Sequence, residues 1–151
     1  MVRIKSFSYL IVLCLGMASA FVSPAWAQQE KAFAEHKIVL QLSDGEPEKQ
    51  QLVLSVASNV MKYYGPDLVE IEIVAFGPGL QLLYKDNENK ARINGLVSSG
   101  GVRFSACENT MISLQKKLGH EIELNDNAKV VPAGVVRLKE LVDQGYMLVR
   151  P

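Results

Sequence analysis

The chain has 151 residues, of which 48% are hydrophobic and 21% are charged, a balance that suits one globular domain and excludes a disordered or collagen-like chain. Sixteen basic and sixteen acidic residues give a formal net charge of zero, so no long-range field favours nucleic acid or an acidic substrate. Composition therefore points to no class of partner, and we expect no nucleic-acid partner.

The first 27 residues have the order of a secretory signal peptide. Two basic residues precede an apolar run over 7–22, and Ala25-Trp26-Ala27 supplies the small residues of a cleavage site. The apolar run is short and interrupted for a membrane span of about 20 residues. We therefore expect cleavage after Ala27, a periplasmic or secreted protein without a membrane partner, and a flexible lead-in over 28–35.

The chain contains two cysteines, Cys14 and Cys107. Cys14 falls within the predicted signal peptide, so cleavage leaves Cys107 alone. A single cysteine cannot form an intramolecular disulfide in an oxidising compartment. Cys107 is therefore a candidate for a functional thiol or an intermolecular contact.

Strand and helix patterns alternate from residue 36 onward. The apolar run 36–42 predicts a buried strand. Apolar residues recur every three to four positions over 47–64, which predicts a helix. A second strand is expected over 68–76, with its C-terminal half buried. Two short helical segments are predicted next, over 80–84 and 93–97.

The second half of the chain continues the alternation. Its predicted elements are a strand over 102–106, a helix over 111–118, a strand over 127–131, a helix over 135–142 and a strand over 146–149. Parallel neighbours need a crossover, and helices supply it. The sequence thus predicts a flavodoxin-like α/β fold over 36–151, a single domain with a mainly parallel five-stranded sheet and helices on both faces.

Ligands of an open parallel sheet bind beyond the carboxyl ends of its strands. Small and turn-forming residues follow four of the predicted strands and let the backbone approach a ligand closely. They make ordinary tight turns equally well, and Asn109 and Thr110 also suit helix capping. The candidate binding positions at this edge are Ser43, Asp44, Gly45, Gly77, Pro78, Gly79, Asn109, Thr110 and Gly134.

Cys107 is the candidate catalytic residue. It falls between a predicted strand and a predicted helix, where free N–H groups and the helix dipole stabilise a thiolate, the nucleophilic form of cysteine. Strand alternation places it on the same face as Arg103 and Ser105, and Arg103 would add a positive charge. The alternative is a small buried hydrophobic side chain, the commoner role of a free cysteine.

Other chemistry-bearing residues indicate no second site. The chain has no zinc, EF-hand, Walker or dinucleotide pattern, and we expect no metal and no cofactor. His36 and His120 are expected to face solvent. Glu70 and Glu72 are interpreted as a solvated strand face rather than as a catalytic carboxylate pair.

Four blocks of sequence resemble the DsrE/DsrF-like superfamily. They are IVLQLSDG at 38–45, VEIEIVAFGPGLQLL at 69–83, GVRFSACENT at 101–110, and VVPAG at 130–134 with GYMLVRP at 145–151. The resemblance implies a flavodoxin-like fold and homo-oligomers such as trimers or hexamers. It also implies that Cys107 accepts sulfane sulfur as a persulfide and passes it between a sulfur donor and an acceptor protein.

Three functions follow as hypotheses. The first is an exported sulfur carrier or sulfurtransferase-like protein that uses Cys107. The second is a non-catalytic periplasmic ligand-binding or oligomeric assembly protein in which Cys107 is buried or only a contact. The third is a redox sensor that forms intermolecular disulfides. Apolar residues for a subunit contact or for the core are Phe33, Tyr63, Leu82, Leu83 and Tyr84.

Overall fold

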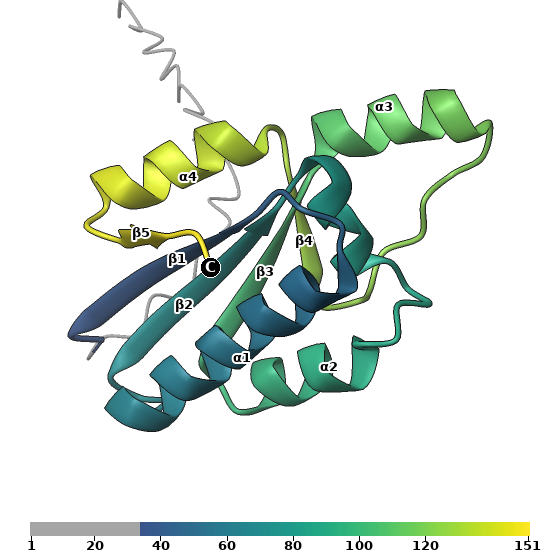
Figure 1. The fold of residues 1–151 in the computed structure, drawn as a ribbon. Coiled ribbons are helices and arrows are strands. Elements are labelled where there is room, and N and C mark those ends of the chain that lie inside the picture. The colour runs from purple at the N-terminus through teal and green to yellow at the C-terminus, as the bar shows by residue number, and fades with distance from the viewer. Residues whose placement is uncertain (1–33) are drawn as a thin grey trace, which may run out of the picture.

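Strands and helices alternate along residues 34–151, the part of the chain that the computed structural model describes (Figure 1). The predicted signal peptide, Cys14, Phe33 and nearly all of the expected lead-in lie outside the described residues. Among the described residues, no helix combines the length and apolar character needed to cross a membrane.

The strands form one all-parallel sheet. Its order is β4-β3-β2-β1-β5, and the strands are β1 (His36–Leu42), β2 (Val69–Ala75), β3 (Val102–Cys107), β4 (Ala128–Val131) and β5 (Met147–Val149). Leu42 pairs with Ala75, Ala75 with Ala106, and Cys107 with Val131. The predicted single-domain, flavodoxin-like α/β fold with five strands is confirmed, and the carboxyl ends of β1 to β4 lie at one edge.

The helices occupy the predicted connections. They are α1 (Pro47–Tyr64), the 3-10 helix η1 (Gly77–Leu83), α2 (Lys90–Ser98), α3 (Glu108–Leu118) and α4 (Gly134–Asp143). The helix expected over 80–84 is the 3-10 helix η1, which begins earlier, because Pro78 suits the first turn of a helix. The helix expected over 111–118 likewise begins earlier, directly after Cys107.

Helices cover both faces of the sheet, as predicted. The larger core joins the sheet to α1, η1 and α2, whereas the smaller core joins Val39 and Val74 to Leu138, Leu141 and Tyr146 beneath α4. The chain steps in one direction from β1 to β4 and then returns to the other side of β1. Right-handed crossovers therefore place α4 on the face opposite α1 (Figure 1).

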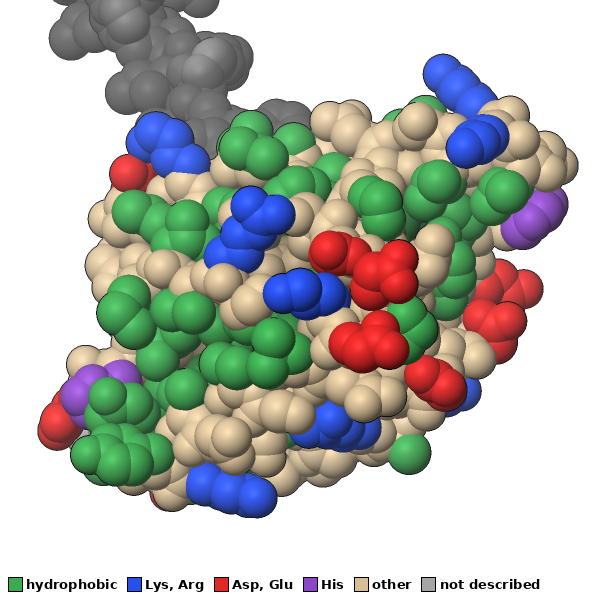
Figure 2. Space-filling view, viewed as in Figure 1, with side chains coloured by type: hydrophobic (Ala, Val, Ile, Leu, Met, Phe, Trp, Pro, Cys, Tyr) green, Lys and Arg blue, Asp and Glu red, His purple; other side chains and the backbone are tan. Residues whose placement is uncertain are grey.

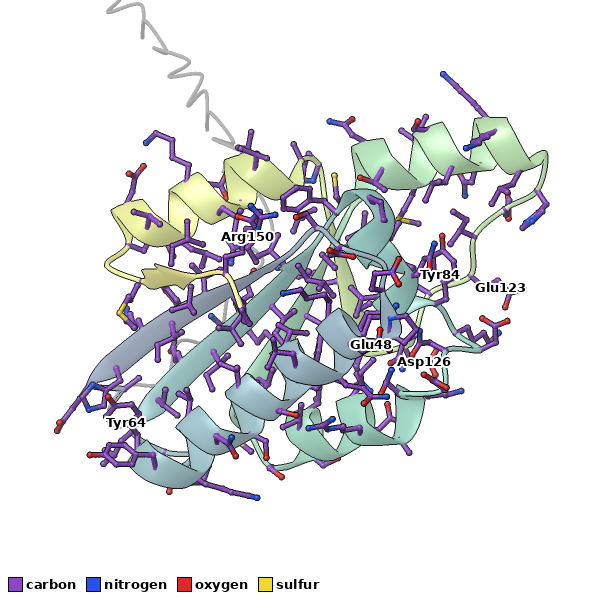
Figure 3. All side chains as sticks on the ribbon, viewed as in Figure 1. Glu48, Tyr64, Tyr84, Glu123, Asp126 and Arg150 are labelled. Atoms are coloured by element: carbon purple, nitrogen blue, oxygen red, sulfur yellow. The ribbon has the colours of Figure 1, made fainter. Side chains whose placement is uncertain are left out.

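Helix α3 packs less deeply than the others, since none of its side chains is buried. Ile112 and Leu118 are 43% and 51% exposed, and apolar side chains are visible on the surface of this helix in Figure 2. After α3 the chain passes the end of η1, where Tyr84 and Leu124 form an isolated antiparallel bridge. Figure 3 labels Tyr84 and Glu123, the residue before Leu124.

The apolar residues considered for a subunit contact separate into two groups. Leu82 and Leu83 are fully buried, and Tyr84 packs partly against the same core. Tyr63 is 82% exposed. Among the described members of this set, only Tyr63 is largely exposed and thus readily available for a contact between subunits.

Candidate functional site

The loops that follow β1 and β2 pack tightly against each other at the carboxyl edge of the sheet. A Cβ at Gly79 would lie 2.4 Å from the carbonyl oxygen of Leu42, and one at Gly45 would lie 3.1 Å from the Cβ of Pro78. Gly77 adopts a φ of +54°, a left-handed conformation that glycine tolerates best. These glycines bring the two loops into contact.

The loop that follows β4 reaches the same place. A Cβ at Gly134 would lie 2.9 Å from the Cβ and Cδ1 atoms of Phe76, so only a glycine allows the first residue of α4 to approach Phe76 this closely. The backbone N–H of Asn109 donates to the carbonyl oxygen of Pro132 at 3.3 Å. The starts of α3 and α4 are therefore adjacent.

Cys107 lies where these two helices begin. It is the last residue of β3 and the residue directly before α3, and the residue is only 4% exposed. Burial raises the pKa of the Cys107 thiol, but hydrogen bonds from the Thr110 hydroxyl and from the backbone N–H groups of Gly134, Thr110 and Asn109 outweigh it. The pKa of Cys107 therefore falls below the ordinary cysteine value, which favours the thiolate.

Thr110 is oriented by the β2–η1 loop. The N–H of Gly77 donates to the Thr110 Oγ1 at 3.0 Å. Because that oxygen already accepts a hydrogen bond, its single proton is available to the sulfur of Cys107. Asn109 and Thr110 lie inside α3, and no side chain caps this helix, so the capping role considered for them is not the one they play.

The predicted binding positions thus divide into two groups. Gly77, Asn109, Thr110 and Gly134 surround Cys107 directly or through one hydrogen bond. The β1–α1 loop is instead held by its own turn, in which the Asp44 Oδ1 accepts from the N–H of Glu46 at 3.0 Å and the carbonyl of Gly45 accepts from Gln50 at 2.9 Å. Ser43, Asp44, Gly45, Pro78 and Gly79 support the edge through packing and turn geometry.

The solvated strand face predicted for Glu70 and Glu72 is wrong. Both residues are only 1% exposed, because β2 is the central strand of the sheet and α4 covers this face. Glu70 accepts a hydrogen bond from the hydroxyl of Tyr146. Glu72 is bound at both carboxylate oxygens by the guanidinium of Arg137, at 2.7 and 2.8 Å.

The expected contribution of Arg103 to the thiolate is also corrected. Its guanidinium is bound to Glu72 at 3.3 Å, to Glu70 at 3.4 Å and to the hydroxyl of Tyr146 at 2.6 Å. Arg103 is therefore committed to the buried carboxylates. Hydrogen-bond donors, rather than a neighbouring cation, lower the pKa of Cys107.

A groove of about 480 Å³ lies on the α4 side of the sheet, beside these charged residues. It follows β3 and β4 toward the loop that precedes Gly134, and its lining includes Ser105, Lys129, Val130, Pro132, Val136 and Arg137. The groove thus offers an open, partly apolar surface close to the candidate thiolate. The ion pairs of Glu70, Glu72, Arg103 and Arg137 form a buried charge cluster. The sequence predicted neither this cluster nor the groove.

The two histidines lie away from Cys107. His36 is half-buried, with its ring centroid 3.9 Å from that of Tyr64, so its expected exposure is only partly correct. His120 is exposed and contacts the carbonyl oxygen of Glu121. Residues 34–151 contain no group of three or more His, Cys, Asp or Glu side chains placed to hold a metal ion.

Comparisons with known proteins bear on the fold of this chain and not on its chemistry. No family model matches this chain, and no curated protein matches it. The solved structure of MTH1491 from Methanobacterium thermoautotrophicum is similar, with a TM-score of 0.68 and 27% sequence identity over 78% of this chain and 100% of MTH1491. MTH1491 is described as a protein of unknown function, so the similarity bears on the fold and not on an activity.

Proposed function

We propose that this protein carries sulfane sulfur as a persulfide on Cys107, as a sulfur carrier or sulfurtransferase-like protein. The observation that carries the proposal is the set of donors around the sulfur, which comes from the starts of two helices and lowers the pKa of the thiol. A lowered pKa increases the fraction of thiolate at neutral pH and makes the thiolate a better leaving group. Both properties serve a residue that must accept sulfur and release it.

The proposed reaction has two displacement steps. The Cys107 thiolate attacks the outer sulfur of thiosulfate, a bond forms between the two sulfur atoms, the S–S bond of thiosulfate breaks, and sulfite leaves with the bonding pair. An acceptor thiolate then attacks the outer sulfur of the persulfide, and the Cys107 thiolate leaves. The backbone N–H groups that stabilise the Cys107 thiolate as the nucleophile of the first step also stabilise it as the leaving group of the second step.

Intact-mass analysis of the protein after treatment with thiosulfate or polysulfide tests this function. We expect a gain of one sulfur atom, about 32 Da, that dithiothreitol removes. Cys107→Ser is the control and should gain nothing. A wild-type thiol that is alkylated normally but never gains sulfur would contradict the proposal.

The resemblance to the DsrE/DsrF-like superfamily supports the same function and adds two proposals. Homo-oligomers, such as trimers or hexamers, are supported by exposed apolar side chains on α3 and α4, among them Ile112, Leu118 and Val135. Export is supported by the signal-peptide pattern of residues 1–27. Sedimentation and the N-terminal sequence of the mature protein, expected to begin at Gln28, test them.

Ligand binding without sulfur transfer is the second candidate, and the groove beside α4 favours it. In that case, small metabolites should raise the melting temperature of the wild-type protein and of Cys107→Ser equally. Val136 lines the groove and is largely exposed, so Val136→Glu should abolish the effect while leaving the fold intact. Sulfur loading of Cys107 in the absence of any such ligand would favour the first candidate.

A further inference from the structure

Two buried glutamates on the central strand need an explanation that the thiol chemistry does not supply. A carboxylate removed from water is costly unless charged and hydrogen-bonded partners replace the water. Glu70 finds its partners in Tyr146, directly before β5, and in Arg103 of β3. The partners of Glu72 come from the two elements that build the Cys107 site.

Glu72 is bound from two sides. Arg137 of α4 donates from its Nε to one carboxylate oxygen and from its Nη2 to the other. From β3, the Ser105 hydroxyl donates to Oε1 at 2.7 Å and Arg103 donates to Oε2 at 3.3 Å. Burial raises the pKa of Glu72, but these hydrogen bonds and charges hold it below its usual value, so the residue is a carboxylate that accepts four hydrogen bonds.

The two elements joined by Glu72 are those whose relative position sets the thiol environment. Ser105 lies two residues before Cys107 on β3, and Arg137 lies three residues after Gly134 on α4. The N–H of Gly134 donates to the sulfur of Cys107. Gly134 packs closely against Phe76, so it cannot move further toward that side chain.

We propose that Glu72 is a positioning residue of the candidate site: by binding Arg137 and Ser105 together, it holds α4 against β3 so that the N–H of Gly134 points at the sulfur of Cys107. The role of Glu72 in sulfur transfer rests on the function proposed above. Its role in holding the geometry of the site is independent of that function. Glu72 is distant in sequence from every residue that contacts the sulfur.

The test compares the thiol pKa in Glu72→Gln and in the wild-type protein, measured from the pH dependence of Cys107 alkylation. Loss of the Gly134 hydrogen bond should raise the thiol pKa by about one pH unit. The direction is decisive. Removal of a negative charge from the neighbourhood, which leaves the positive charges of Arg103 and Arg137 less compensated, would by itself lower the thiol pKa.

Two controls isolate the positioning role. Glu70→Gln removes an equally buried carboxylate from the same strand, and Glu140→Gln removes an exposed one that contacts Arg137 at 3.4 Å. Neither should raise the thiol pKa. A rise of equal size in Glu70→Gln, or an unchanged or lower thiol pKa in Glu72→Gln, overturns the inference.

Arg137→Lys serves if Glu72→Gln does not fold, because it keeps the charge and loses the two-point contact. Arg137→Lys should also raise the thiol pKa, by a smaller amount than Glu72→Gln. An unchanged thiol pKa would again count against the inference. Sulfur loading is measured in parallel. Normal loading of the wild-type protein with no pKa change in the variants refutes only the positioning role, whereas the expected pKa change without any loading refutes only sulfur carriage.

Discussion

The thiol of Cys107 differs from that of an ordinary cysteine in the hydrogen bonds that its sulfur accepts. Its place between a strand and a helix was predictable, because a parallel α/β pattern places strand ends at the ligand-binding edge. Asn109 and Thr110 follow it by two and three residues, so their contribution was local. Gly134 could not be assigned to the sulfur in the same way, since only the pairing of β3 with β4 brings the start of α4 to Cys107.

The Thr110 hydroxyl gives the first prediction at this scale. Thr110→Val keeps the shape of the side chain and removes both the hydrogen bond to Cys107 and the acceptor for the N–H of Gly77. The pKa of Cys107 should rise by about one pH unit, which corresponds to about 1.4 kcal/mol of lost thiolate stabilisation. The pH dependence of alkylation measures it.

Thr110→Ser is the matched control, because it retains the hydroxyl. Its thiol pKa should stay close to the wild-type value. If Thr110→Val and Thr110→Ser behave alike, the hydroxyl has no part in stabilising the thiolate.

At the scale of elements, the alternation of strands and helices was predictable from apolar periodicity, whereas the neighbours of each element were not. Glu70 and Glu72 alternate with apolar residues in the sequence, a pattern typical of a strand with one face in water. The strand order places β2 at the centre, where both faces are covered. Arg137 lies 65 residues from Glu72, so no local pattern connects them.

The packing of α4 against Phe76 gives a prediction for that helix. A methyl group at residue 134 would lie 2.9 Å from Phe76 atoms, so Gly134→Ala forces the start of α4 away from the sheet. We expect a loss of about 1–3 kcal/mol in the free energy of unfolding together with a higher pKa of Cys107. Chemical denaturation and alkylation measure the two effects.

Gly95 provides the comparison for this substitution. It lies inside α2, and a Cβ there would have no neighbour within 4 Å. Gly95→Ala should therefore stabilise the protein by about 0.5–1 kcal/mol and leave the thiol unchanged. A Gly134→Ala variant as stable as Gly95→Ala would show that the contact with Phe76 is not restrictive.

At the scale of the whole molecule, the hydrogen bond of Tyr146 to the buried charge cluster makes the free energy of unfolding depend on pH in the alkaline range. Burial and the hydrogen bond to Glu70 raise the pKa of Tyr146 to about 12, above its ordinary value near 10. A group whose pKa is raised by folding stabilises the folded state below its unfolded pKa. Its contribution is lost as the pH rises from about 10 to about 12.

Tyr146→Phe should remove that part of the pH dependence. The variant is expected to be less stable than the wild-type protein at neutral pH, and the difference between them should shrink between about pH 10 and pH 12. Urea unfolding across this range measures it. Tyr63→Phe, at an exposed position, is the control, and a constant difference between Tyr146→Phe and the wild-type protein would argue against the coupling.

The pairing of β5 with β1 has a consequence for the order of folding. Strand β5 follows α4 and joins the last part of the chain to the first strand, a contact of long sequence separation that forms slowly. The Gly134 donor reaches Cys107 only when α4 has docked. Until then the sulfur lacks this donor, and the pKa of the thiol lies higher than in the complete site. Full acidity of Cys107 is thus a late event in folding, and its alkylation rate reports when the C-terminal part of the domain has closed.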